Sequence, residues 1–180
     1  MRYKNYKGVE REPYNIDWLD VSRPFFLLEG CINSTFIENS VSFGGTKHFE
    51  KLLDQYPKIL ENKHNCNVIW DNDDAGYDGL PKSIKCGFNW FNWKKIPIHA
   101  STCNDINDLV LAGNVFEHNS LGYITHDSIL QYCENSRGAI LMTTLMYGDR
   151  DAIRKEKSKQ LFNEMNNRRN NANKIDFTWS

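Results

Sequence analysis

The sequence predicts an α/β fold, a mostly parallel and roughly four-stranded sheet flanked by helices, with a helical C-terminal appendage. Two observations support this prediction. Short apolar runs alternate along the chain with segments whose apolar residues recur at helical spacing. Glycine, proline or acidic residues follow closely after these segments, as expected where strands and helices end.

Four short segments are expected to form the strands, because apolar runs of this length are too short for helices and are typical of buried parallel strands. The first three are Phe25–Leu28, Val41–Phe43 and Asn67–Trp70, and the fourth lies within the aromatic stretch 87–98.

Helices are expected between and after these strands. Lys47–Tyr56 has apolar residues at helical spacing and is followed by Pro57. Asp74–Cys86 is expected to be helical despite two glycines near its start. Further helical segments are expected at 31–38, 106–111, 128–132, 139–146 and 149–170.

Composition excludes several classes of protein. No run of 18 apolar residues is present, so we expect no membrane span. The five cysteines form no C-x-x-C pair, which argues against a disulfide framework or a zinc ribbon and favours a reducing, cytoplasmic location.

Positive charge is concentrated at the two ends of a chain whose net charge is −1. Arg2, Lys4 and Lys7 lie at one end, and lysines and arginines are frequent within 150–174 at the other. The acidic centre that remains is compatible with a metal site beside an anionic substrate, or with ordinary scatter of charge.

Three acidic segments carry the chemistry that the sequence suggests. Glu29 follows the first expected strand, Asp71 and Asp73 follow the third, and Asp105 begins a helical segment. Because the carboxyl ends of parallel strands meet at one edge of a sheet, Glu29 and Asp71 are expected to face one crevice. Clustered carboxylates need a cation, and oxygen ligands select a hard ion such as Mg²⁺.

These segments resemble the Toprim domain, which is shared by topoisomerases, bacterial-type primases and some nucleases. The matching residues are Leu28–Gly30, the turn Gly44–Thr46 and the D-x-D-x-A-G-type segment Asp71–Gly76. The resemblance spans roughly 22–113. It implies a basic and aromatic lead-in at 1–21, a Toprim catalytic domain at 22–113, and a helical appendage with a basic tail at 114–180.

Two further segments resemble primases, in particular the primase subunit of large tailed phages. Glu29–Ser40 is similar to the E-G-P-I-D-S-x-F-x-x-N segment of those subunits, and Asn104–Leu109 is similar to their K-D-x-N-D-L element. The chain departs from the pattern at Asn33, where the family has aspartate. It also has no zinc-binding segment ahead of the domain, which puts template recognition by this chain in doubt.

The resemblance implies the catalytic core of a DNA primase, a nucleotidyltransferase that makes short RNA primers during DNA replication. Glu29, Asp71 and Asp73 would be catalytic and, with Asp105, would bind one or two Mg²⁺ or Mn²⁺ ions. The implied partners are a single-stranded DNA template, nucleoside triphosphates and a replicative helicase. A phage-encoded chain would work in the host cytoplasm.

The lysines and arginines near the ends and after the fourth strand are candidates for nucleic-acid contacts, namely Arg2, Lys4, Lys7, Lys94 and Lys95. Exposed lysines more often only solvate the surface. The aromatic stretch 88–93 could stack bases, although alternating aromatic residues more often pack in a core.

Alternatives remain open for the acidic residues and for the activity. Asp73, Asp74 and Asp105 are also good helix N-caps, and Gly44–Gly45 could be only a turn. A Toprim nuclease would use the same acids to hydrolyse phosphodiesters. An inactive Toprim module would only bind a partner.

Overall fold

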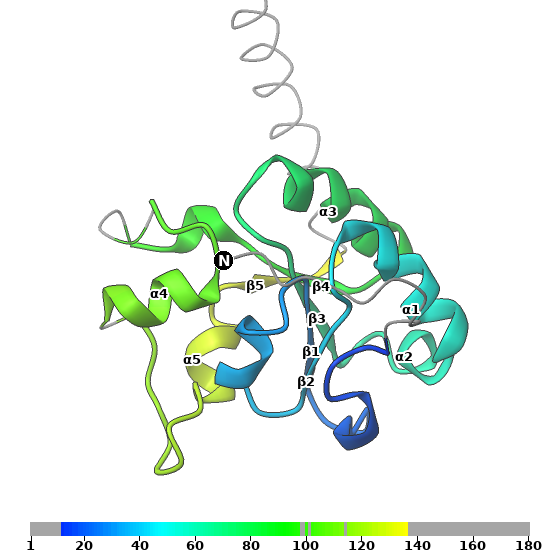
Figure 1. The fold of residues 1–180 in the computed structure, drawn as a ribbon, viewed down its shortest axis with the longest axis horizontal. Helices are drawn as coiled ribbons and strands as arrows, with labels where there is room; N and C mark the ends of the chain where they lie inside the picture. The colour runs from blue at the N-terminus through cyan, green and yellow to red at the C-terminus, as the bar shows by residue number, and fades with distance from the viewer. Residues whose placement is uncertain (1–11, 98–99, 101, 114, 137–180) are drawn as a thin grey trace, which may run out of the picture. The chain divides into compact units, whose positions relative to one another are not determined.

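The computed structural model describes residues 12–97, 100, 102–113 and 115–136. The chain divides into two compact units, 1–139 and 140–180, and every described residue belongs to the first (Figure 1). Of the features expected from sequence, the basic residues Arg2, Lys4 and Lys7 and the helical segments at 139–146 and 149–170 lie outside the described residues.

A five-stranded, mostly parallel sheet forms the centre of this unit, in the order β2-β1-β3-β4-β5 (Figure 1). The strands are β1 (Phe25–Leu28), β2 (Ser40–Ser42), β3 (Cys66–Ile69), β4 (Asn89–Phe91) and β5 (Cys133–Glu134). Strands β1 to β4 pair in parallel, and β5 pairs antiparallel with β4.

The prediction of an α/β fold with a mostly parallel sheet is therefore confirmed, but the expected number of about four strands is wrong. The additional strand, β5, is only two residues long and too short to leave a periodic pattern in the sequence. Residues 115–136, which were expected to begin the helical appendage, instead contribute β5 and a short helix to this unit.

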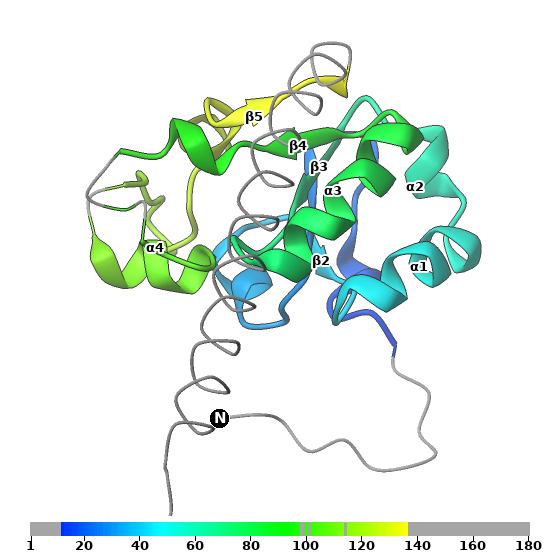
Figure 2. The same cartoon turned by 90° about the horizontal axis from the view of Figure 1, so that it is seen from above.

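Helices lie on both sides of the sheet (Figure 2). They are α1 (Phe49–Gln55), α2 (Lys58–Glu61), α3 (Asp74–Cys86), α4 (Ile106–Ala112) and α5 (His126–Leu130). Short 3₁₀ turns, η1 to η4, occupy Ile16–Trp18, Asn33–Phe36, Thr46–His48 and Trp93–Lys95. In Figures 1 and 2, α1, α2 and α3 lie on one side and α4 on the other.

Two apolar layers hold the sheet between these helices. On one side, Phe26, Leu28 and Ile69 pack in a cluster with Ile106 and Leu109 of α4. On the other side, aromatic rings contact one another, and the ring pairs are Phe43–Phe49, Phe43–Trp70, Phe49–Trp70 and Phe49–Phe88.

The aromatic stretch 88–93 belongs to this core. Phe88, Trp90, Phe91 and Trp93 are all buried, with at most 9% of any one exposed. Their burial leaves little ring surface for bases to stack on, so core packing, rather than base stacking, accounts for this stretch.

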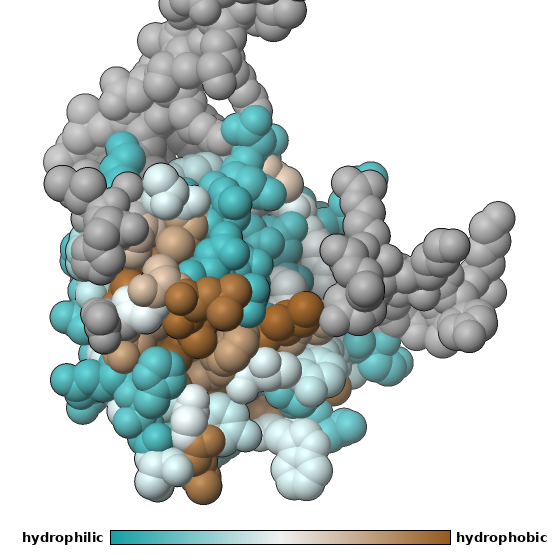
Figure 3. Space-filling view, turned by 60° about the vertical axis from the view of Figure 1, so that its left-hand side comes forward, coloured by the Kyte–Doolittle hydropathy of each residue, from teal (hydrophilic) through white to brown (hydrophobic). Residues whose placement is uncertain are grey.

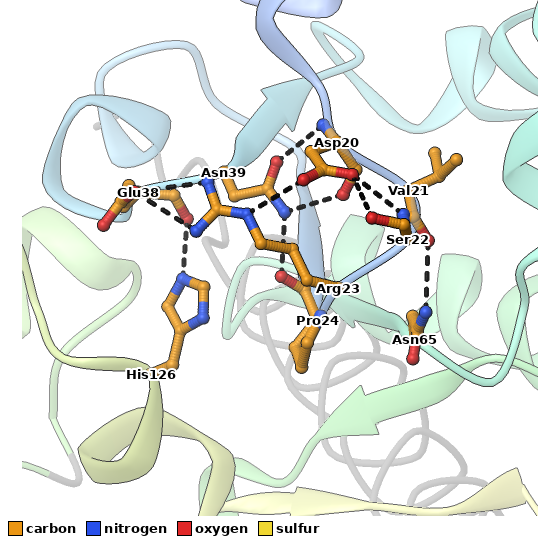
Figure 4. Close-up of polar contacts among 9 residues, drawn as sticks. All are labelled: Asp20, Val21, Ser22, Arg23, Pro24, Glu38, Asn39, Asn65 and His126. Atoms are coloured by element: carbon orange, nitrogen blue, oxygen red, sulfur yellow. Dashed lines mark hydrogen bonds and ion pairs between the residues drawn. The ribbon is translucent and has the colours of Figure 1, made fainter.

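A polar network ties the amino ends of the strands together, at the edge opposite the acidic segments (Figure 4). The Asn39 amide donates to the carbonyl oxygens of Asp20 and Pro24, both at 2.9 Å. The Arg23 guanidinium pairs with Asp20 and with Glu38, which anchors the segment ahead of β1. This network is structural and lies away from the acids expected to bind metal.

The surface of the described unit is mixed in polarity. Figure 3 shows one face on which an apolar area is bordered by hydrophilic residues. The exposed large apolar side chains are Tyr14, Trp18, Ile32, Leu60, Leu111 and Leu121. Among the residues that the structure describes, no helix combines the length and the apolar character needed to cross a membrane.

Candidate functional site

The fold brings the three acidic segments to one edge of the sheet. Strands β1 and β3 are parallel neighbours, and Leu28 is in register with Ile69. Glu29 follows β1 directly, and Asp71 comes two residues after the end of β3. Both carboxylates therefore emerge at the carboxyl ends of adjacent parallel strands, which is the edge expected from the sequence.

Glu29 is held through one of its two carboxylate oxygens. Thr46 donates to Oε1 twice, from its backbone N–H at 3.3 Å and from its hydroxyl at 3.0 Å. Burial raises the pKa of Glu29, and the Asp73 charge adds to this. The other oxygen, Oε2, is buried and has no hydrogen-bond partner among the described residues. A buried acceptor without a partner is costly, so Oε2 is suited to a cation or a donated proton.

Asp71 is the most perturbed acid of the site. Burial and repulsion by neighbouring carboxylates together raise its pKa to about 7, and the repelling groups are Glu29, Asp105, Asp73 and Asp108. These contributions mean that the four other carboxylates lie within electrostatic reach of Asp71. A cluster of this kind lowers its energy by binding protons or a cation.

The amide of Asn33 holds Asp71 in place. Asn33 lies in η2 and is 97% buried, and its Nδ2 donates to Asp71 Oδ1 at 3.2 Å. Its Oδ1 accepts from the backbone N–H of Asn107 at 3.2 Å. The residue that departs from the family pattern thus connects the segment after β1 with both of the other acidic segments.

Asn72 joins the Asp71–Asp73 turn to the segment that carries Asp105. Its backbone N–H donates to the Asn104 carbonyl at 2.6 Å, and its side-chain amide donates to the Cys103 carbonyl at 2.8 Å. The Tyr77 hydroxyl donates to the remaining Asn72 oxygen at 2.8 Å. The middle residue of the D-x-D segment therefore fixes the third acidic segment beside the second.

Asp73 and Asp105 both serve as helix N-caps. Asp73 Oδ1 accepts from the Gly76 N–H at the start of α3, and Asp105 Oδ1 accepts from the Asp108 N–H at the start of α4, both at 2.8 Å. The capping alternative is therefore confirmed for both residues. Each of these bonds uses one carboxylate oxygen, and capping does not prevent the same carboxylate from also binding a metal.

Gly76 allows α3 to begin very close to Asp71. A Cβ at this position would overlap the Asp71 carbonyl oxygen. Gly79 is similar one turn later, because a Cβ there would come within 2.5–2.6 Å of the Trp70 ring. The glycines that weaken the sequence-based helix prediction are thus required for close packing of α3 against the Asp71 segment.

The candidate nucleic-acid residues within the described part of the chain lie after β4. Lys94 and Lys95 are exposed on η4. Lys95 pairs with Glu134 of β5 at 2.7 Å, which partly neutralises it. The structure does not describe Arg2, Lys4 or Lys7.

The donor set of the site fits a hard cation. It consists of carboxylates, and the partnerless Glu29 Oε2 lies among them. Across the described residues, no three acidic, histidine or cysteine side chains form a ready-made metal site. Mg²⁺ is commonly held by one or two carboxylates with water completing its shell, so it does not require such a group.

Sequence reasoning identified the acids but missed the residues that orient them. Asn33, Thr46 and Asn72 all lie inside motifs that the sequence analysis quoted. Their roles depend on which backbone and side-chain groups they meet in the fold, and spacing along the chain carries no signal for that.

Comparison with known proteins found no matching family model and no matching curated protein.

Proposed function

We propose that this chain is the catalytic core of a DNA primase, joining ribonucleotides into short primers on a single-stranded DNA template. The observation that carries the proposal is the meeting of Glu29 and Asp71 at the carboxyl ends of adjacent parallel strands, with Asp73 and Asp105 within electrostatic reach. The Toprim-like order of these motifs connects that geometry with nucleotidyl transfer.

Glu29, Asp71 and Asp73 would hold Mg²⁺ or Mn²⁺, with Asp105 in support. A bound divalent ion stabilises negative charge on the attacking and leaving oxygens during displacement at phosphorus. The fixed carboxylates of this site require little rearrangement to receive it, because Thr46 already orients Glu29 and Asn33 already orients Asp71.

In the proposed reaction a bond forms between the primer 3′-oxygen and the α-phosphorus of the incoming nucleotide. The bond from that phosphorus to the bridging oxygen breaks, and pyrophosphate leaves. Where Glu29 is not itself a metal ligand, its Oε2 would instead accept the proton of the 3′-hydroxyl, a role suited to a buried carboxylate with a raised pKa and no hydrogen-bond partner on that oxygen.

The proposed partners follow from this reaction and from the family resemblance. Template DNA and nucleoside triphosphates are required by the chemistry, and a replicative helicase is proposed by resemblance alone. Lys94 is an exposed candidate for template phosphates, and Lys95 is a weaker one because Glu134 pairs with it. We propose a cytoplasmic location, within the host if a phage encodes the chain.

Incubation of the chain with single-stranded DNA, labelled ribonucleoside triphosphates and Mg²⁺ or Mn²⁺ tests the proposal. New labelled oligoribonucleotides are the expected product, and Asp71→Asn should abolish them. Lys85→Ala is a suitable control, since it removes a charge from an exposed position at the far end of α3.

The same assay separates the proposal from its alternatives. Shortening of the DNA without new RNA would indicate a nuclease that uses these acids with water as the nucleophile. Unchanged DNA and no product, under conditions where the chain is folded, would favour a binding module.

A further inference from the structure

A hollow of about 560 Å³ lies beside the acidic site. One wall is the turn formed by residues 44–48, which follows β2, and the other is α3, through Ala75, Asp78 and Lys82. None of these hollow-lining residues belongs to the acids assigned above to metal binding.

Thr46 connects this hollow to the acidic site. It lines the hollow, and its N–H and hydroxyl both donate to Glu29 Oε1. On the opposite wall, Ala75 lies two residues after Asp73 in the chain. A ligand bound at the acids could therefore extend directly into the hollow.

The lining of the hollow has an excess of positive charge, in contrast to the acidic site. Lys47 and Lys82 supply two cationic side chains, whereas Asp78 is the only acid among the lining residues. Lys47 is exposed, and Lys82 lies 3.1 Å from Glu50 in a pair at the protein surface. Surface pairs of this kind are weak, so Lys82 can exchange Glu50 for another anion.

The turn is open to a ligand on one side, beside Gly45. Gly44 and Gly45 have φ angles of 72° and 120°, in the region that favours glycine. No atom lies within 4 Å of a Cβ built at Gly45, so the space beside this backbone is empty rather than filled by packing. The open side of Gly45, next to lysines, allows close approach by phosphate oxygens.

We infer that this hollow binds the triphosphate group of the incoming nucleotide, with Lys47 and Lys82 contacting its β- and γ-phosphates. The inference rests on the proposed function, because nucleotidyl transfer requires the α-phosphate at the acids and the departing phosphates beside them. A triphosphate concentrates several negative charges in a short length, which matches two lysines around one compact hollow. A nucleic-acid strand spreads its charges over a longer path.

Calorimetric titration of the full chain with inorganic triphosphate in the presence of Mg²⁺ tests the inference. Lys47→Ala and Lys82→Ala are each expected to weaken binding by about tenfold, the usual effect of losing one charged hydrogen bond. Lys85→Ala removes a lysine one turn further along α3, outside the hollow, and should bind as the unsubstituted chain does.

Absence of triphosphate binding by the unsubstituted chain would overturn the inference. Binding by both hollow variants as tight as that of the unsubstituted chain would also overturn it. A short single-stranded DNA should not displace triphosphate. If it does, and the two lysine variants also lose affinity for that DNA, the hollow is a nucleic-acid site instead.

Binding of triphosphate is measured without catalysis, so the inference and the proposed function can fail separately. If the chain binds triphosphate through these lysines but makes no primers, the hollow is a triphosphate site and the primase proposal is wrong. In a chain that makes primers, both lysine variants should raise the KM for nucleotide about tenfold and leave kcat nearly unchanged.

Discussion

The Asn33 side chain donates from Nδ2 to Asp71 Oδ1 at 3.2 Å. The orientation of the amide is determined by its other partner, because the Asn107 N–H can donate only to the Asn33 oxygen. Asn33 therefore presents its N–H₂ group to Asp71. An aspartate here would have no such donor in its ionised form and would add another negative charge to the cluster.

Replacement of Asn33 by alanine should weaken divalent-ion binding by roughly tenfold, the lower end of the range for residues that orient metal ligands. Mn²⁺ titration followed by electron paramagnetic resonance measures this. Asn67→Ala is a matched control, because Asn67 is also buried and donates to two backbone carbonyls, but at the amino end of β3. Equal Mn²⁺ affinity in both variants would show that Asn33 has no role in positioning Asp71.

The Asp71→Asn variant should be more stable than the unsubstituted chain when metal is absent. The pKa of Asp71 is about 7 in the folded protein against an ordinary value of 3.8, so the unfolded chain releases its proton first as pH rises. Stability contributed by this group therefore falls between about pH 4 and pH 7. Denaturant unfolding at pH 8 should show that the free energy of unfolding of Asp71→Asn exceeds that of the unsubstituted chain by on the order of 1–3 kcal/mol.

At pH 4, where Asp71 is largely protonated in the folded chain, the gain should largely disappear. A variant that is less stable than the unsubstituted chain at pH 8 would contradict the repulsion inferred among the carboxylates.

Affinity for Mg²⁺ should rise with pH, because the ion and a proton compete for the same carboxylates. The Asp71 pKa of about 7 places the main change between pH 6 and pH 8, over which affinity should increase by about tenfold. The raised pKa of Glu29 acts in the same direction. Calorimetry across this range measures the effect, and Asp71→Asn should show a flatter profile. A constant affinity would mean that Asp71 is not a ligand.

Alanine at Gly76 should destabilise the chain, although alanine in place of glycine usually stabilises a helix. Its methyl group would overlap the Asp71 carbonyl, and overpacking of this kind costs roughly 1–3 kcal/mol. The displaced Asp71 should also bind Mg²⁺ less well. Thermal unfolding together with Mg²⁺ titration checks both effects. A variant that is more stable and binds Mg²⁺ normally would rule out the close approach of Gly76 to the Asp71 carbonyl.

Much of the fold was accessible from sequence because buried parallel strands leave short apolar runs. The helix predicted at Asp74–Cys86 has the same bounds in the structure. Its ends carry strong local signals, namely an aspartate cap at Asp73 and a left-handed Gly87. The antiparallel β5 lacks such signals, since its two residues depend on pairing with β4.

The candidate site was predictable only in part, because some of its contacts depend on tertiary packing rather than on position in the chain. Acidic residues after parallel strands meet at one edge whatever the details of packing, so Glu29 and Asp71 could be placed together from their positions in the chain. The bonds from Thr46 and Asn33 depend on tertiary geometry. The hollow beside them depends on how η3 meets α3, which no sequence spacing encodes.

A crystal of the full chain soaked in Mn²⁺ tests whether the acids bind a divalent ion, through the anomalous scattering of that ion. We expect an anomalous peak at the carboxyl edge of the sheet, bounded by Glu29 and Asp71, that disappears in Asp71→Asn. No peak at that edge under saturating Mn²⁺, or a peak held by residues elsewhere, would contradict it.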